Sequence, residues 1–360
     1  MAILTPITPH FLPSGTLLEG DIITRGHINR TYVSVVQQDG ATKRYVHQLI
    51  NTHVFRDPVR MMDNIRWVIE HLAAKRSGDP GLLHLLPNDD GEVYFKDDEG
   101  NYWRTYNYVE GSTVFDIVPS ADVAYEAAVA FGKFLHDLSD LDAQRFHITI
   151  PDFHHTPRRI ERFKQALAQP VEGRTETCQA QIEFVLRNED LGGALINVLE
   201  NHPQTIRVTH NDTKVNNVLF CEKSLKGMTV IDLDTVMPGS VLFDVGDLIR
   251  TACNSAAEDE QDLSKVQFDF DKYAAIVRGF AETIGDTLHP AEWDAMASCG
   301  AVITLECGIR FLTDYLDGDK YFRIHRDGQN LDRARTQFHL VQQMIDRMDE
   351  MKAAVNSVRF

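Results

Sequence analysis

The stretch Val208-Thr-His-Asn-Asp-Thr-Lys-Val-Asn-Asn-Val-Leu-Phe220 and the later segment Val230-Ile-Asp-Leu-Asp234 decide how this chain is interpreted. Together they contain the spacing His-x-Asp-x-x-x-x-Asn, a short apolar strand, a glycine-containing turn and a second strand that ends at an aspartate. Apolar runs on both sides of such a turn are typical of a β-hairpin. The pattern therefore predicts that one end of a hairpin brings together Asp212, Asn217 and Asp232.

These three side-chain types, in this order, are the ones that transfer of a phosphoryl group requires. A carboxylate accepts the proton of the attacking hydroxyl, an amide oxygen binds one metal ion, and a second carboxylate links the metal to the phosphates. We therefore interpret Asp212 as a catalytic base and Asn217 and Asp232 as ligands of Mg²⁺, with ATP as the phosphoryl donor.

Each of the three residues also has a purely structural interpretation. Asp212 follows Asn211, and Asn-Asp pairs favour turns. Asn217 could be an ordinary hairpin residue, and Asp232 could cap a helix or lie on the surface. However, an acid placed after a Val-Ile run in a buried strand is costly unless it has a partner. Taken jointly, the residues favour the functional interpretation.

Four neighbouring polar residues have less specific roles. We expect His210 to support the loop backbone rather than transfer protons. Asp244 and Asp247 stand where the next helix should begin, so N-capping is a sufficient explanation for both, although Asp244 could also brace the loop. For Asp234, two alternatives stay open: a second metal ligand or an exposed acid.

Up to about residue 109 the pattern is mainly β. We predict strands over 31–36 and 43–50, joined by a tight turn, and a second pair over 92–96 and 102–109. Between the pairs, Asp57-Pro58 should open a helix that carries apolar residues at helical spacing. The first lobe is therefore expected over residues 1–109, as an antiparallel sheet with one helix laid against it.

From residue 110 to 360 the pattern is mainly helical, and Asn107-Tyr-Val-Glu-Gly111 is the candidate hinge. Ser120 should cap one helix, and Thr156-Pro157 should provide the N-cap and first residue of another. Further long helices are predicted over 270–286, 290–316 and 331–355.

Composition excludes several classes of function. The chain has 360 residues, of which 43% are hydrophobic and 25% charged, which suits a globular protein with a substantial core. Its net charge of −17 argues against nucleic acid or an anionic membrane as a partner. Five separated cysteines suggest free thiols, and the first residues lack the pattern of a signal peptide. We expect a cytoplasmic protein that binds small molecules, with no protein partner implied.

The His-Asn-Asp-x-x-x-x-Asn loop, the Ile-Asp-x-Asp strand end and the Phe-Asp-x-Gly-Asp helix start resemble the aminoglycoside phosphotransferase and choline kinase family. The resemblance implies an α+β, protein-kinase-like fold with two lobes and ATP bound between them. Within this group the chain is most similar to the N-acetylhexosamine 1-kinases. The similarity runs through Gly26-His-Ile-Asn29, His154-His-Thr-Pro157, Met237-Pro-Gly-Ser240 and Glu306-Cys-Gly-Ile-Arg-Phe-Leu-Thr-Asp-Tyr-Leu316.

That resemblance implies ATP- and Mg²⁺-dependent phosphorylation of N-acetylglucosamine or N-acetylgalactosamine at the anomeric hydroxyl. By motif, Asp212 would be the base, and His27 and Arg310 would contact the sugar together with Asp212. Adenine would bond to the hinge backbone at Tyr108, Val109 and Glu110. From the pattern alone, Arg310 is either paired with Asp314, four residues on, or aimed into a polar pocket.

One position departs from the wider kinase pattern. The second strand should present a lysine to the α- and β-phosphates, but Gln48 stands there instead. An amide can donate a hydrogen bond but carries no charge. Either Lys43 or Arg44 reaches across, or the metal ions carry more of the neutralisation. In protein kinases the strand lysine pairs with a glutamate of the following helix. Here Glu70 lies late in the predicted helix, and Asp63 has a shorter side chain than a glutamate.

Two other functions remain open. The first is a kinase of the same fold that acts on another alcohol, such as choline, an aminoglycoside or homoserine. The second is a pseudokinase that binds nucleotide without turnover, which the missing lysine suggests. The complete set of Asp212, Asn217 and Asp232 argues against the pseudokinase.

Overall fold

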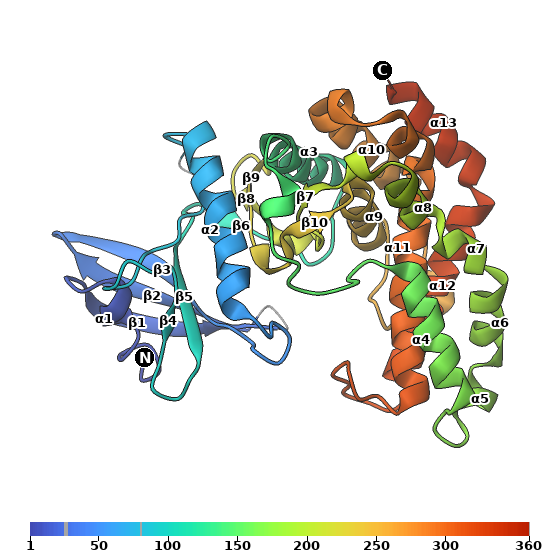
Figure 1. Ribbon diagram of the computed structural model, residues 1–360, viewed down its shortest axis with the longest axis horizontal. Coiled ribbons are helices and arrows are strands. Elements are labelled where there is room, and N and C mark those ends of the chain that lie inside the picture. The colour runs from blue at the N-terminus through green and yellow to red at the C-terminus, as the bar shows by residue number, and fades with distance from the viewer. Residues whose placement is uncertain (25–27, 80, 360) are drawn as a thin grey trace.

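A computed structural model describes residues 1–24, 28–79 and 81–359, and its N-terminal part is built on a five-stranded antiparallel sheet. The order of the strands in space is β1-β2-β3-β5-β4 (Figure 1). Their bounds are β1 Thr16–Ile23, β2 Arg30–Gln38, β3 Ala41–Leu49, β4 Phe95–Lys96 and β5 Tyr102–Asn107.

The hairpin of β2 and β3 forms as its sequence predicts. Gln38 pairs with Ala41, so the loop consists of only Asp39 and Gly40. Both loop residues have positive φ, 52° and 78°, as a two-residue turn that matches the twist of the strands requires.

Other strand predictions were less accurate. The strand β1 was not predicted, because most of its residues are exposed and it shows no clean alternation of apolar and polar residues. Only Phe95–Lys96 of the predicted 92–96 segment is a strand, and β5 ends at Asn107 rather than 109.

Helix α2 (Pro58–Lys75) begins where Asp57-Pro58 predicted it. The Asp57 carboxylate accepts from the Arg60 N–H at 3.1 Å, and proline at the first helical position loses no hydrogen bond. One face of α2 is buried against the core through Met61, Met62, Ile65 and Val68 among others.

Two small sheets carry the polar motif. One is the antiparallel pair β7 (Arg207–Thr209) and β10 (Met237–Gly239), and the other has the order β6-β8-β9. The predicted hairpin is β8 (Val218–Cys221) and β9 (Gly227–Val230), whose free edge pairs with β6 (Ser112–Thr113) next to the candidate hinge.

The rest of the chain is mainly helical and lies to the right in Figure 1, with the C-terminus far from the sheet. Besides α1 (Thr8–Phe11), the helices are α3 Ala121–Asp137, α4 Thr156–Ala168, α5 Arg174–Thr177, α6 Gln179–Arg187, α7 Glu189–Gly192, α8 Ala194–Asn201, α9 Val241–Ala252, α10 Phe270–Ile284, α11 Pro290–Asp317, α12 Gln329–Asp346 and α13 Met348–Val358.

The predicted helix starts lie within two residues of those in the structure, while α10 ends at Ile284 rather than at 286. Ser120 caps α3 as predicted, its hydroxyl accepting from the Val123 N–H. The N-cap of α4 is His155, whose Nδ1 accepts from the Arg158 N–H, so the prediction of Thr156 was wrong by one residue. The predicted 331–355 helix is two helices, which break at Arg347.

Helices α9 and α11 cross closely, and this crossing fixes the frame of the site. A Cβ atom on Gly246 would lie 2.6 Å from the Cys299 carbonyl oxygen, and one on Gly300 would lie 2.5 Å from Ile249 Cγ2. Glycine at both contacts lets the two backbones touch. Helix α11 is long and apolar enough to span a membrane, but 78% of that window is buried within the protein. It is therefore a core helix.

A buried histidine in the sheet makes stability depend on pH. His47 is fully buried, and its ring nitrogens lie 2.8 Å from Ser34 Oγ and 2.8 Å from Thr105 Oγ1. Burial lowers the pKa of His47 to about 4. Below about pH 6.5 an unfolded chain binds a proton here that the folded chain does not, so stability falls as the pH falls towards 4.

Between about pH 7.5 and pH 5, His47 should cost the wild type about 2 kcal/mol of its free energy of unfolding. We predict that His47→Gln does not show this part of the loss. Urea unfolding of both proteins at each pH measures the difference. Parallel loss of stability in wild type and variant would contradict the prediction.

Candidate active site

The hairpin brings Asp212, Asn217 and Asp232 to one end, as the sequence predicted. Asp212 lies in the loop after β7, Asn217 ends a 3₁₀ turn directly before β8, and Asp232 follows β9 by two residues. The Asn217 side-chain nitrogen donates to the Asp212 carbonyl oxygen at 2.8 Å and to Asp212 Oδ2 at 3.2 Å. The charge of Asp212 also acts on the Asp232 carboxyl, so the three groups form one cluster.

Lys214 belongs to this cluster, although we did not single it out from the sequence. Its Nζ lies 2.9 Å from Asp212 Oδ1. Burial alone would raise the pKa of Asp212, but the Lys214 charge outweighs it and holds the pKa below its usual value. Asp212 is therefore ionised at neutral pH and able to accept a proton or a hydrogen bond from a hydroxyl. The position of Lys214, two residues after the aspartate in one loop, was the available signal.

The surroundings of Asp232 disfavour the charged form of its carboxyl. The Asp232 side chain is exposed. Even so, partial desolvation by the surrounding protein and repulsion from Asp234 and Asp212 raise its pKa to about 7. Its backbone has a φ of 61°, an αL conformation that is uncommon for residues other than glycine and clusters at functional sites.

The donor set suits Mg²⁺. In the described residues nothing donates to the Asn217 side-chain oxygen, so that oxygen is available to a metal ion. No cluster of three or more His, Cys, Asp or Glu side chains in residues 1–24, 28–79 and 81–359 is placed to hold a metal. One carboxylate and one amide are enough for Mg²⁺, which usually keeps waters and substrate phosphates as its other ligands.

Asp244, on the first turn of α9, holds the loop that carries Asp212. Its carboxylate accepts from the backbone N–H groups of His210 at 2.9 Å and Asn211 at 2.7 Å. Ser240 is the N-cap of α9, so N-capping does not explain Asp244, whereas the bracing alternative fits. Asn211 has a φ of 64°, and its amide nitrogen donates to the Thr235 carbonyl at 3.0 Å.

His154 and Glu306 hold the same loop from the side of α11. His154 Nε2 lies 2.8 Å from the Asn211 carbonyl oxygen, and Nδ1 lies 3.0 Å from Glu306 Oε1. Burial disfavours charge, but the bond to Glu306 raises the pKa of His154 above its usual value. Thr156 also donates to Glu306, at 2.7 Å. When it is protonated, the imidazole can donate to both partners.

His210 has the supporting role expected from the sequence. Burial lowers the pKa of its fully buried ring. Nε2 lies 3.0 Å from the Ile231 carbonyl oxygen, and the Asp212 backbone N–H donates to Nδ1 at 3.2 Å. A neutral ring with the proton on Nε2 satisfies both contacts and ties the loop to the hairpin.

Asp234 is neither exposed nor free, so the surface alternative was wrong. It is 3% exposed, forms an ion pair with Arg104 of β5, and accepts from the Asn29 side chain at 2.6 Å. Asn29 in turn accepts from the Asn51 N–H at 3.0 Å. These contacts connect the first sheet to the segment that carries Asp232.

Gln48 and the hinge lie on the sheet side of this junction. The Gln48 side chain donates to Thr31 Oγ1 at 3.1 Å and accepts from Arg104 Nε at 2.9 Å. At the hinge, the Tyr108 N–H donates to the Arg44 carbonyl at 3.3 Å. Within the described residues, the N–H groups of Val109 and Glu110 have no acceptor, so both can bond to a ligand.

The two predicted sugar contacts have different outcomes. His27 lies outside the described residues. Arg310 does not pair with Asp314, whose carboxylate instead accepts from the backbone N–H groups of residues 320, 321 and 322. Arg310 lies one turn of α11 after Glu306. The Arg310 guanidinium is 5.4 Å from the centre of the Phe322 ring.

A model of the phosphotransferase enzyme family matches residues 20–276 of the chain, which include the whole cluster. The chain belongs to this family. Solved structures with similar folds include a microcompartment-associated aminopropanol kinase, with 16% identity over 98% of both chains and a TM-score of 0.64. A spectinomycin phosphotransferase in complex with ADP and spectinomycin has 12% identity over 96% of this chain and 97% of that one, with a TM-score of 0.62.

A third similar structure is a choline kinase from Cryptosporidium parvum Iowa II, with 14% identity, coverage of 99% of this chain and 98% of that one, and a TM-score of 0.58. At these identities the likeness shows the fold, and it confirms the expected protein-kinase-like architecture of sheet and helical parts. The protein is a small-molecule phosphotransferase with the fold of the aminoglycoside phosphotransferases and choline kinases.

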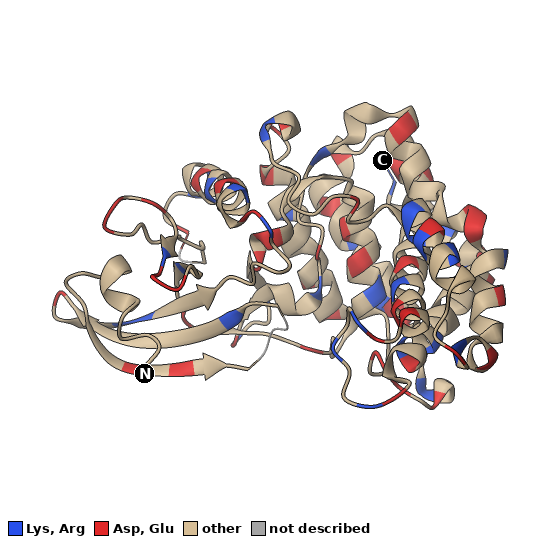
Figure 2. Cartoon of the chain, turned by 60° about the horizontal axis from the view of Figure 1, so that its bottom comes forward, with Lys and Arg blue, Asp and Glu red and all other residues tan. Residues whose placement is uncertain are grey.

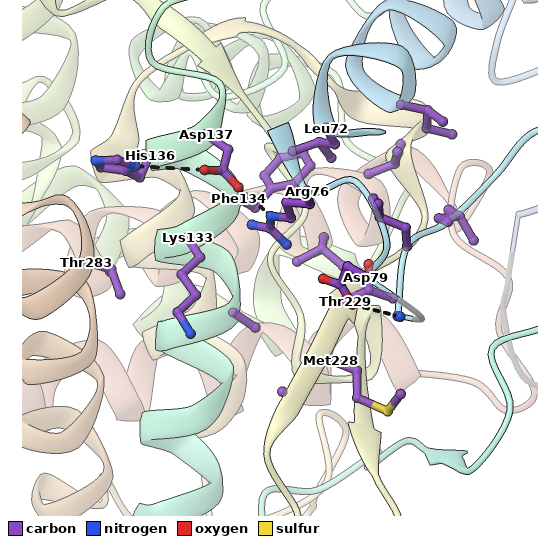
Figure 3. A pocket seen from close by; sticks show the side chains of 18 of the residues that line it. Leu72, Arg76, Asp79, Lys133, Phe134, His136, Asp137, Met228, Thr229 and Thr283 are labelled. Atoms are coloured by element: carbon purple, nitrogen blue, oxygen red, sulfur yellow. Dashed lines mark hydrogen bonds and ion pairs between the residues drawn. The ribbon is translucent and has the colours of Figure 1, made fainter. Parts of the chain in front are cut away.

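The phosphotransferase also has a pocket of about 760 Å³, whose lining includes Val230 and Leu233 from the segment around Asp232 (Figure 3). Side chains of α2, α3 and β9 line it, and Figure 3 shows Arg76 and Asp137 facing one another there. None of Asp212, Asn217 and Asp232 lines this pocket, so it is not the candidate active site.

Acidic side chains are spread over both parts of the molecule rather than gathered in one segment (Figure 2).

We predict that Asp244→Asn lowers the free energy of unfolding by about 2 kcal/mol. The amide has one acceptor oxygen for the two N–H groups, and its NH2 group can accept from neither. The substitution should also speed amide hydrogen exchange in residues 210–214 of the phosphotransferase. The exposed Asp349, in the first turn of α13, provides the control Asp349→Asn, which should change neither quantity. Unchanged exchange in Asp244→Asn would contradict the bracing role.

Proposed function

We propose that this phosphotransferase transfers the γ-phosphoryl group of ATP to the anomeric hydroxyl of an N-acetylhexosamine, either N-acetylglucosamine or N-acetylgalactosamine. The observation that carries the proposal is the cluster of Asp212, Asn217 and Asp232 at one end of the hairpin. ATP as donor is supported by the solved complex of a spectinomycin phosphotransferase with ADP, and the acceptor by the sequence motifs.

Asp212 has the contacts of a catalytic base. It is ionised beside Lys214 and next to the amide of Asn217. In the proposed reaction the sugar oxygen bonds to the γ-phosphorus, the bond from phosphorus to the ADP oxygen breaks, and the hydroxyl proton passes to Asp212. Lys214 then faces the charge that develops on the transferred group.

Asn217 and Asp232 would hold Mg²⁺. When bound, the ion would neutralise phosphate charge and orient the triphosphate. The protein's own contribution is position: Asp244 and His154 fix the loop, and the hinge N–H groups of Val109 and Glu110 would bind adenine. In this proposal residues 1–109 and 110–360 are two lobes, with the nucleotide between them.

The surroundings of Arg310 support a neutral, hydroxylated acceptor. Arg159 lies near enough that burial and the charge of Arg310 together lower its pKa. Arg159 Nη2 donates to the Phe153 carbonyl oxygen at 3.0 Å. Two guanidinium groups here would repel a quaternary ammonium, whereas recognition of such a cation uses aromatic cages. This favours a sugar over choline.

An acceptor assay tests the proposal. We expect turnover of ATP with N-acetylglucosamine or N-acetylgalactosamine, and NMR of the product should show phosphate at C1. Choline, homoserine, kanamycin and spectinomycin should give at least tenfold lower turnover. Activity with one of these four and none with the N-acetylhexosamines would replace the sugar by that acceptor.

Substitution of the base tests whether the cluster does the chemistry. Asp212→Asn should lower kcat by about 10² to 10⁴-fold with little change in ATP affinity, because the amide cannot take the proton. Asp232→Ala should weaken binding of Mg-ATP as well. Wild-type turnover in Asp212→Asn would remove Asp212 from the base role. A wild-type chain that binds ATP but phosphorylates no acceptor would favour the pseudokinase alternative.

A further inference from the structure

The strand position that carries a phosphate-binding lysine in protein kinases is occupied by Gln48, and the structure places another cation beside it. Gln48 of β3 and Arg104 of β5 are direct partners across the sheet. The Arg104 Nε donates to the Gln48 side-chain oxygen at 2.9 Å. The neutral amide thus orients a guanidinium at the place where a charge is missing.

Arg104 is buried and incompletely satisfied. Its side chain is 0% exposed, and its Nη1 forms the ion pair with Asp234. Its Nη2 has no hydrogen-bond partner in the described residues. A buried donor without an acceptor costs about 1–3 kcal/mol, so an arginine that served only as the counter-ion of Asp234 would be expected to use both nitrogens.

The pair of Arg104 and Asp234 lies at the Asp232 end of the proposed site, since Asp234 follows Asp232 by two residues. The charge of Arg104 acts on both Asp234 and Asp232, and it partly offsets the repulsion between these two acids. Asp232 is the proposed ligand of the ion that would accompany the β- and γ-phosphates. An acceptor that reached Nη2 from this end would satisfy the orphan donor and be held by a full positive charge.

The two cations that the sequence offered for this task are engaged elsewhere. Lys43 is exposed, on the part of β3 next to the turn. Arg44 pairs with Glu110, and its guanidinium lies 3.9 Å from the centre of the Tyr108 ring, at the hinge. Neither candidate for the helix glutamate meets Gln48, since Asp63 pairs with Arg66 at 3.0 Å and Glu70 is exposed.

We propose that Arg104 is the phosphate-binding cation of this enzyme. Its Nη2 donates to the β-phosphate of the nucleotide, and Asp234 is its carboxylate partner. The pair of Arg104 and Asp234 thus does the work that a strand lysine and a helix glutamate do in protein kinases. Guanidinium suits this role because its planar N–H groups can bind a carboxylate on one edge and a phosphate on another. The inference rests on the proposed nucleotide site but not on the identity of the acceptor.

Calorimetric titration with ADP and with AMP tests the role. Arg104→Met should weaken ADP binding at least tenfold and AMP binding less than threefold, because AMP lacks the β-phosphate. The double variant Arg104→Met with Asp234→Asn removes both buried charges and should show the same loss without leaving a carboxylate unpaired. Adding Gln48→Lys to Arg104→Met should restore at least part of the ADP affinity.

Arg207→Met is the matched control. Arg207 pairs at 2.7 Å with the fully buried Glu292, outside the cluster, so its loss should reduce stability without changing the ratio of ADP to AMP affinity. A wild-type ratio in Arg104→Met or in the double variant would overturn the inference, as would equal loss of ADP and AMP. A wild-type chain that binds neither ADP nor ATP would instead contradict the proposed function.

Discussion

The carboxylate of Asp244 accepts from two consecutive backbone N–H groups, and the position of Asp212 depends on this contact. The loop it holds contains Asn211 with a positive φ, a conformation that needs support from its surroundings. Asp244 can give that support because α9 is fixed against α11 through glycine contacts. The site is therefore positioned by the helical core and not by the hairpin alone.

Charge at the junction follows from the same arrangement. Each acid near the proposed phosphate site has a different neighbour: Lys214 for Asp212, Arg104 for Asp234, and no cation in direct contact for Asp232 among the described residues. Partial desolvation and the repulsion of Asp234 and Asp212 raise the pKa of Asp232 to about 7. A divalent ion bound at Asp232 would relieve this repulsion.

Much of the fold could be predicted from local patterns. Asp39-Gly40 fixed a two-residue turn, and Asp57-Pro58 and Ser120 marked helix starts, because each acts on a backbone only a few residues away. The strand β1 escaped prediction because it is mostly exposed and has little apolar alternation. The break at Arg347 was missed because the apolar spacing of a helix continues through it.

The sequence by itself determined the convergence of Asp212, Asn217 and Asp232, since the loop and hairpin that hold them are contiguous in the chain. It did not determine the partners of Asp234, Asp244 and His154, which come from segments 33 to 205 residues away. The choice of Arg104 over Lys43 or Arg44 beside Gln48 was likewise decided by the tertiary structure. Strand pairing and helix packing select which of several equivalent charges become neighbours, and no local pattern records that selection.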